Sequence, residues 1–251
     1  MIHLSKFLIG FRHKRVFRAK SMLGQIIDGI LEECPEQFTR VTETHDREEL
    51  VLTDSNDRLL LRNNKDDIIF ENTKLFDREA KTYVEVDKAN LIAIAQKCAP
   101  IITDTIRLQQ DFKRIGMIFE FRIKKWEAMG DNTFVQFVHN NFLNYPLTEL
   151  SDAEIAESSL RFAYKLRVPG GGVIRKLKDY RNVIIRIEES SGIDEDGTTQ
   201  KCLFISVDIQ HYYDPSRRIS DVNIADHFDF AWTHLKQKVI PELTRKGIIV
   251  N

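Results

Sequence analysis

The sequence predicts an α+β fold, with antiparallel sheets that carry helices on one face. Several stretches alternate apolar and polar residues and are separated by turn residues, which is typical of antiparallel strands with one solvated face. The helical stretches do not alternate regularly with single strands, as they would in a doubly wound parallel sheet. Apolar residues make up 42% of the 251 residues, which is enough for a core and excludes disorder for most of the chain.

The first half begins with an apolar strand at residues 3–11. Residues 16–33 and 86–107 predict helices, because apolar residues recur there at spacings of three and four. Pro35 ends the first helix, and Pro100 interrupts or kinks the second. The remaining elements are strands: a hairpin of 41–53 and 58–72, whose second arm can be divided by a polar turn at 63–67, and the alternating stretch 114–123.

The second half is predicted as a helix, three strands and a helix. An amphipathic helix is predicted at residues 131–150, and alternation predicts strands at 159–168, 183–189 and 201–213. The closing helix covers 224–244. The two halves are therefore possible pseudo-repeats, each ending a sheet with a long helix. We divide the chain into 1–127 and 128–251, which can also form one continuous domain.

Charge is distributed unevenly along the chain. The net charge is −1, but residues 1–27 contain six Lys and Arg residues and no carboxylate. This segment therefore carries +6 and the rest of the chain carries −7. Clustered cations release counterions from phosphates, which predicts contact with nucleic acid or with an acidic partner. A solvated loop is the alternative interpretation. The residues assigned to this contact are Arg12, Lys14, Arg15, Arg18 and Lys20.

A glycine cluster provides a second candidate for phosphate contact. Backbone amides of a glycine-rich loop, with cations nearby, can bind a phosphate. The GxxxxGK[ST] pattern is absent, so a hairpin or a bulge is the alternative interpretation. The residues are Gly170, Gly171, Gly172, Arg175 and Lys176.

No catalytic, metal or cofactor site is assigned. His227 and His234 are seven residues apart on one predicted helix, about 10.5 Å along its axis, which is too far for one ion. We interpret them as surface and core-edge histidines. A metal-dependent nuclease of one type has an acid followed by an acid-x-Lys strand, and Asp104 followed by Glu120-Phe121-Arg122 imitates this spacing. However, Arg122 stands where the lysine is expected, and arginine cannot act as a base. That activity is retained as an alternative hypothesis.

Cysteine content and hydropathy indicate a cytoplasmic protein. Cys34, Cys98 and Cys202 are far apart in the sequence and are expected to be buried thiols in a reducing compartment. No apolar run approaches the ~20 residues that a membrane helix needs, so no membrane contact is expected.

The stretch from Arg114 to Phe121 follows a long helix and resembles the R-I-G-hydrophobic-R-Y strand of a sporadically distributed, uncharacterised family of prokaryotic proteins of about 250 residues. Phe119 and Glu120 stand where that pattern has Arg-Tyr. The strand at 206–210 and the last helix are similar to the family's C-terminal layout. The resemblance implies a prokaryotic, cytoplasmic accessory protein of mobile or defence loci, and it implies no activity, cofactor or catalytic residue.

These observations predict a non-enzymatic binding or assembly module, an accessory subunit that acts with a protein partner or with a second copy of itself. Nucleic-acid binding through residues 12–20 and a metal-dependent nuclease are the alternatives.

Overall fold

The computed structural model describes residues 4–14, 16, 21–35, 37–44, 49–54, 56–62, 66–77, 79–108, 111–124, 129–130, 132–143, 158–167, 179–193 and 198–248. The strands are β1 (Lys6–His13), β2 (Arg40–Thr44), β3 (Glu49–Thr53), β4 (Asp57–Arg62), β5 (Asp67–Thr73), β6 (Leu75–Asp77), β7 (Thr82–Val84), β8 (Phe112–Ile123), β9 (Ser159–Arg167), β10 (Tyr180–Ile193) and β11 (Thr199–Arg217). The helices are α1 (Leu23–Glu33), α2 (Lys88–Thr105), α3 (Phe134–Val138), α4 (Ile224–His234) and α5 (Ile240–Arg245).

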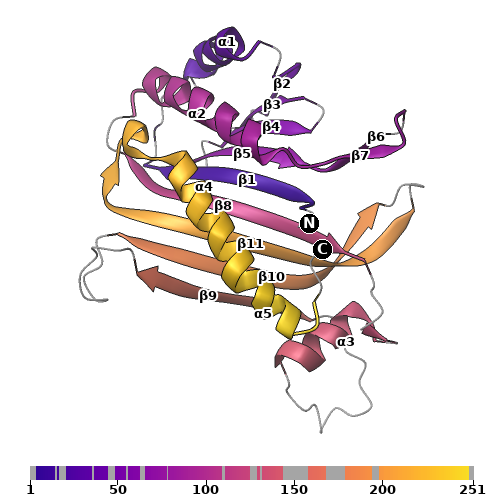
Figure 1. The fold of residues 1–251 in the computed structure, drawn as a ribbon. Helices are drawn as coiled ribbons and strands as arrows, with labels where there is room; N and C mark the ends of the chain where they lie inside the picture. The colour runs from indigo at the N-terminus through magenta and orange to yellow at the C-terminus, as the bar shows by residue number, and fades with distance from the viewer. Residues whose placement is uncertain are drawn as a thin grey trace.

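Nine of the strands form one antiparallel sheet in the order β2-β3-β4-β5-β1-β8-β11-β10-β9 (Figure 1). β1 and β8 each begin a run that consists of a strand, a helix, further antiparallel strands and a long helix. Both strands belong to the half 1–127 and pair with each other at the centre, and β8 also pairs with β11 of the half 128–251. The sheet is therefore continuous across the proposed boundary at residues 127 and 128.

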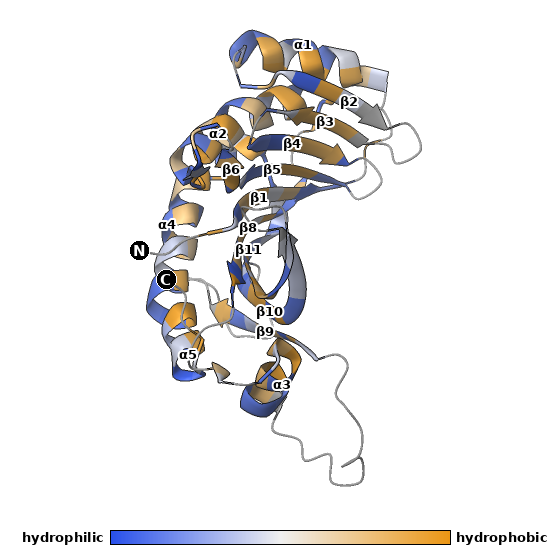
Figure 2. Cartoon of the chain, turned by 90° about the vertical axis from the view of Figure 1, so that its right-hand side faces the viewer, coloured by the Kyte–Doolittle hydropathy of each residue, from blue (hydrophilic) through white to orange (hydrophobic). Residues whose placement is uncertain are grey.

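The helices cover one face of this sheet. Figure 2 shows the sheet bending away from α2, α4 and α5, so these helices lie on its convex side and the opposite face is concave. The α+β class with helices packed on one face is thus confirmed. A π-helical turn at Leu235–Val239 joins α4 to α5, so the closing helix is continuous, as predicted.

Aromatic side chains fill the space between the central strands and α4. Phe7 of β1 stacks on Phe119 of β8 with ring centroids 5.1 Å apart. Phe228 packs edge-on against Phe7 at 5.7 Å, and Trp232 contacts Phe119 at the same distance. Burial of these rings holds the long helix diagonally across both halves of the sheet.

Several predicted boundaries were wrong. The single strand expected at 41–53 is two strands, β2 and β3, which pair antiparallel. The helix expected from residue 16 begins at Leu23, and α2 continues through Pro100 without ending. The β10–β11 hairpin is much longer than its apolar segments because polar residues continue the pairing as far as Ile193 and Thr199. The short β6–β7 hairpin was not predicted at all.

Candidate functional site

The concave face of the sheet is lined by every second residue of each strand. Side chains alternate between the two faces of a strand, and the odd-numbered residues of β1 and, from Ile115 to Phe121, of β8 are buried toward the helices. No described helix covers the alternate, concave face. The central strands present these residues there: Lys6, Leu8, Gly10 and Arg12 from β1, and Arg114, Gly116, Ile118, Glu120 and Arg122 from β8.

Two glycines lie opposite each other at the middle of the concave face. Gly10 pairs with Gly116 in the β1–β8 register. The next strands place Ile69 beside Gly10 and Gln210 beside Gly116. At Gly10 the backbone of β1 is uncovered, since the nearest atom to a Cβ position is 4.0 Å away, whereas Asp208 Oδ1 lies 3.1 Å from the Cβ position of Gly116 and covers the backbone of β8.

A row of cations and aromatic rings borders these glycines. Arg12 pairs with Arg114, and an Arg114 nitrogen donates to the Tyr212 hydroxyl at 3.3 Å. The Tyr212 ring stacks on Tyr180 with centroids 4.6 Å apart, and Lys165 Nζ lies 4.6 Å from the centre of the Tyr180 ring. The two stacked rings therefore hold one cation at each end, which restricts the positions of both charges.

Asp208 lies beside the glycine pair. Gln210 donates a hydrogen bond to one of its carboxylate oxygens, and Oδ1 is buried without a hydrogen-bond partner. Burial raises the pKa of Asp208 to about 6, against the opposing effect of Arg114 and Arg161. This carboxyl group therefore changes its charge close to neutral pH in the middle of the concave face.

The concave face carries more positive than negative charge. Two of its acids are neutralised locally: Asp67 accepts two 2.7 Å hydrogen bonds from Arg62, and Glu71 contacts Arg58 at 3.3 Å. From β4 to β9 in the order of the sheet, the cations on the concave side include Lys6, Arg12, Arg58, Arg62, Arg114, Arg122, Arg161, Lys165 and Arg186. The acids that the paired registers place on the same side are Asp67, Glu71, Glu120, Glu188 and Asp208.

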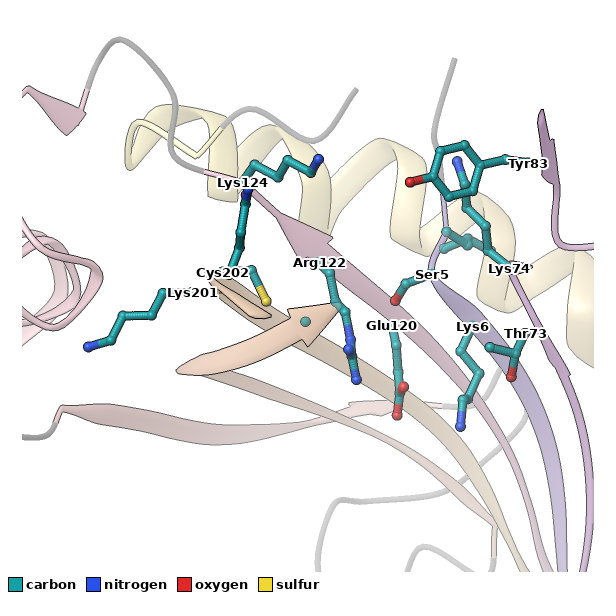
Figure 3. Close-up of a pocket in the computed structure, with 13 residues that line it drawn as sticks. Ser5, Lys6, Thr73, Lys74, Tyr83, Glu120, Arg122, Lys124, Lys201 and Cys202 are labelled. Carbon is teal, nitrogen blue, oxygen red and sulfur yellow. The ribbon is translucent and has the colours of Figure 1, made fainter. Parts of the chain in front are cut away.

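A pocket of about 550 Å³ lies at one end of this face (Figure 3). It is bounded by the start of β1, the end of β8, the far end of the β10–β11 hairpin and Tyr83 of the β6–β7 hairpin. Its volume is in the usual range for small-molecule sites. Five of its thirteen lining residues are cations and one is an acid, Glu120; the cations are Lys6, Lys74, Arg122, Lys124 and Lys201.

The pocket cations differ in their local partners. Lys74 lies 2.6 Å from Glu85, and Lys201 lies 2.7 Å from Glu189, so each has a close carboxylate. Lys6 Nζ lies 3.7 Å from Glu71, a longer contact. The Arg122 guanidinium donates to a backbone carbonyl at 3.5 Å.

Glu120 lies between Lys6 and Arg122, and all three side chains point to the same side of the central strands (Figure 3). Burial raises the pKa of Glu120, while the positive charges of Lys6 and Arg122 oppose this effect. The protonated form of this group is therefore more accessible than for an exposed glutamate, and that form can donate a hydrogen bond.

The predicted basic contact is only partly described. Arg12 lies on the concave face beside Arg114, whereas Lys14 lies 3.4 Å from Asp111, just beyond β1. Arg15, Arg18 and Lys20 lie outside the described residues, as do Gly170, Gly171, Gly172, Arg175 and Lys176. Of the pocket residues, the sequence singled out only Glu120 and Arg122 as site candidates, for the nuclease hypothesis. The pocket itself was not predicted, because its residues come from separate segments around 4–6, 73–83, 120–124 and 192–202.

The residues of the nuclease hypothesis do not meet. Asp104 is an exposed residue of α2, which packs on the convex side, whereas Glu120 lies on the concave face. Among the described residues there is no group of three or more His, Cys, Asp and Glu side chains placed to hold a metal ion.

His227 is more buried than a surface or core-edge histidine, whereas His234 is half-buried. His227 is 3% exposed, and its Nε2 lies 3.2 Å from the Ile209 carbonyl. Its ring centre is 6.2 Å from that of His211, and burial lowers the pKa of His227 to about 3 and that of His211 to about 4. His234 contacts the Tyr164 hydroxyl at 2.9 Å. His227 and His234 are part of α4, and their contacts with Ile209 and Tyr164 connect this helix to β11 and β9.

The three cysteines are buried, as predicted. Two of them are neighbours despite their separation in the sequence: Cys34 and Cys98 bring their sulfur atoms to 3.7 Å where α1 meets α2. Burial is the main cause that raises the pKa of the Cys98 thiol.

The chain matches no family model and no curated protein. In the described part of the chain, none of the helices has the length and apolar character needed to span a bilayer.

Proposed function

We propose that this chain is a non-enzymatic binding module, working as an accessory subunit, and that its concave sheet face binds a nucleic acid. The observation that supports this proposal is the charge of that face, where cations outnumber acids along the strands from β4 to β9. A polyanion gains from such a surface because each neutralised phosphate releases a counterion.

The shape of the face favours the same partner. Eight spacings of about 4.8 Å between nine strands give a width of about 38 Å, and the curvature makes the face a trough. At its centre, Arg12 and Arg114 are register partners next to Gly10, where the backbone of β1 has no side-chain atom within 4.0 Å of a Cβ position other than one from Ile69. A phosphate backbone can therefore approach β1 closely while two guanidinium groups contact it.

The sequence-based expectation of a protein partner or of self-association makes a different prediction for the same face. A protein partner or a second copy of the chain would bind through a complementary surface, and we expect its affinity to depend less on the salt concentration. Nucleic-acid binding should instead weaken steeply with salt. The two possibilities are thus separated by one titration.

The experiment is fluorescence anisotropy with labelled single-stranded and duplex oligonucleotides at low and moderate salt. We expect Arg12→Gln/Arg114→Gln to weaken binding about tenfold or more. The slope of log affinity against log salt should also become shallower by the amount that about two phosphate contacts contribute. Lys236→Gln/Lys238→Gln is the matched control, because these cations are exposed on the convex side and belong to no part of the concave face.

Equal affinities of the two double variants would contradict the assignment of the concave face. Circular dichroism of both variants checks that they are folded. If neither oligonucleotide binds wild type, and light scattering shows a dimer that the Arg12→Gln/Arg114→Gln variant loses, the face is a self-association surface and the nucleic-acid proposal is wrong.

A further inference from the structure

We infer that the pocket at the end of the concave face is a separate site for a phosphate monoester. The residues that line this pocket do not include Arg12 or Arg114. The inference therefore does not depend on whether the centre of the concave face binds nucleic acid. Two features carry it: the surplus of cations over acids in the pocket lining and the arrangement of three charged side chains at its floor.

Size excludes a bare inorganic ion as the full occupant. The pocket volume of about 550 Å³ is suited to a molecule of nucleotide size, in which a charged head is joined to a larger body. The walls offer hydroxyl donors from Thr73 and Tyr83 and an amide from Gln200 in addition to the cations. A lining of this kind suits a polar ligand better than a lipid tail.

Charge selects the part of the pocket that binds the anionic head. Lys74 and Lys201 each have a carboxylate within 2.7 Å, which already balances much of their charge. The contact of Lys6 with Glu71 is longer, at 3.7 Å. Lys6 and Arg122 share one acid of the pocket lining, Glu120, whose carboxyl is partly buried between them. A dianionic monoester matches these two cations, and arginine can bind two of its oxygens at once.

Glu120 sets the sign of the expected mutational effect. An ionised Glu120 repels a phosphate, whereas its neutral form donates a hydrogen bond to a phosphate oxygen. Gln at this position removes the charge and keeps a donor. Glu120→Gln should therefore strengthen phosphate binding, an outcome opposite to the loss of cleavage that a nuclease would show for the same variant.

A phosphate monoester can come from a free nucleotide or from the 5′ end of a nucleic-acid strand. The first measurement is calorimetric titration with adenosine 5′-monophosphate, with adenosine as the uncharged control. We expect adenosine 5′-monophosphate to bind wild type, Arg122→Gln and Lys6→Gln each to weaken it at least fivefold, and Glu120→Gln to tighten it severalfold. Lys236→Gln, which removes an exposed cation on the convex side, should leave it unchanged.

The second measurement compares 5′-phosphorylated and 5′-hydroxyl oligonucleotides. A phosphate-dependent gain in affinity that Arg122→Gln abolishes assigns the pocket to strand ends, and equal affinities together with nucleotide binding assign it to free nucleotides. Binding of neither phosphorylated ligand, or equal binding of adenosine and its monophosphate, would overturn the inference even if the concave face binds oligonucleotides. Nucleotide binding in the absence of any oligonucleotide binding would instead contradict only the proposed function.

Discussion

Asp208 holds its Oδ1 atom 3.1 Å from the position that a Cβ atom on Gly116 would occupy. This carboxylate therefore lies directly over the backbone of β8 and fills part of the space that a side chain would take. The equivalent position on Gly10 is open, since the nearest atom, from Ile69, is 4.0 Å away. Two glycines that pair across the centre of the sheet thus have different roles.

Gly116→Ala should destabilise the protein by about 1 kcal/mol, because Asp208 must move away from a hydrogen bond that Gln210 donates. Gly10→Ala should raise stability by about 0.5 kcal/mol, since alanine loses less backbone entropy in a strand. Urea unfolding of the two variants checks this. Equal effects would show that Asp208 does not require a glycine beneath it.

The contact of α1 with α2 depends on another glycine, Gly29. A Cβ atom on Gly29 would come within 2.9 Å of Ile101 Cγ2, whereas Gly24 of the same helix has nothing within 4 Å. Gly29→Ala should therefore lower the free energy of unfolding by about 1–3 kcal/mol. Gly24→Ala should raise it by about 0.5 kcal/mol through helix propensity. Thermal unfolding followed by circular dichroism should separate the two signs.

Asn72 connects the β4–β5 hairpin to the start of α2. Its amide donates to Asp57 at 2.7 Å, and its carbonyl oxygen accepts from the Asp87 backbone at 2.9 Å. Asn72→Ala removes both bonds of a side chain that is 1% exposed and leaves Asp57 with the hydrogen bonds of its other carboxylate oxygen, so it should cost about 2 kcal/mol. Thr39→Ala, which removes an exposed hydrogen bond to Asp54, should change stability by less than about 0.5 kcal/mol. Guanidinium denaturation of both variants tests this contrast.

Acid should weaken the attachment of α4 to the sheet. The folded-state pKa of His227 is about 3 and that of His211 about 4, both below 6.5, so the unfolded chain binds more protons as pH falls from 6.5 toward 4. Burial is the main cause, and Arg181 adds repulsion. Relative to His227→Gln, wild type should lose stability steadily across this interval, on the order of 1 kcal/mol per pH unit.

Asp208 provides the control with the opposite sign. Its folded-state pKa of about 6 lies above 3.8, so the folded chain binds more protons between these values and stability is lost as pH rises from 4 to 6. Relative to Asp208→Asn, wild type should therefore be less stable at pH 7 than at pH 4. Urea unfolding at several pH values gives both difference curves, and two curves of the same sign would contradict the assignment of these groups.

Periodicity accounts for the parts of the fold that were predicted. The alternation along 114–123 identified a strand with one buried face, and the spacing of apolar residues along 224–244 identified the long closing helix. Turn residues identified the hairpin between β3 and β4 and the division of 58–72 into β4 and β5. The turn between β2 and β3 was missed, because residues 45–48 contain no glycine, proline or asparagine.

By itself, the sequence determined the α+β class, the alternation along the central strands such as 114–123 and the burial of the cysteines, because these depend on local spacing and hydrophobicity. Only the tertiary structure decided which strands that are distant in the sequence are neighbours. Pairing β1 with β8 brought Lys6 beside Glu120, and the long β10–β11 hairpin closed the pocket around them. Such contacts follow from the register of distant strands, which is selected by packing of the whole core and leaves no periodic signal in either segment.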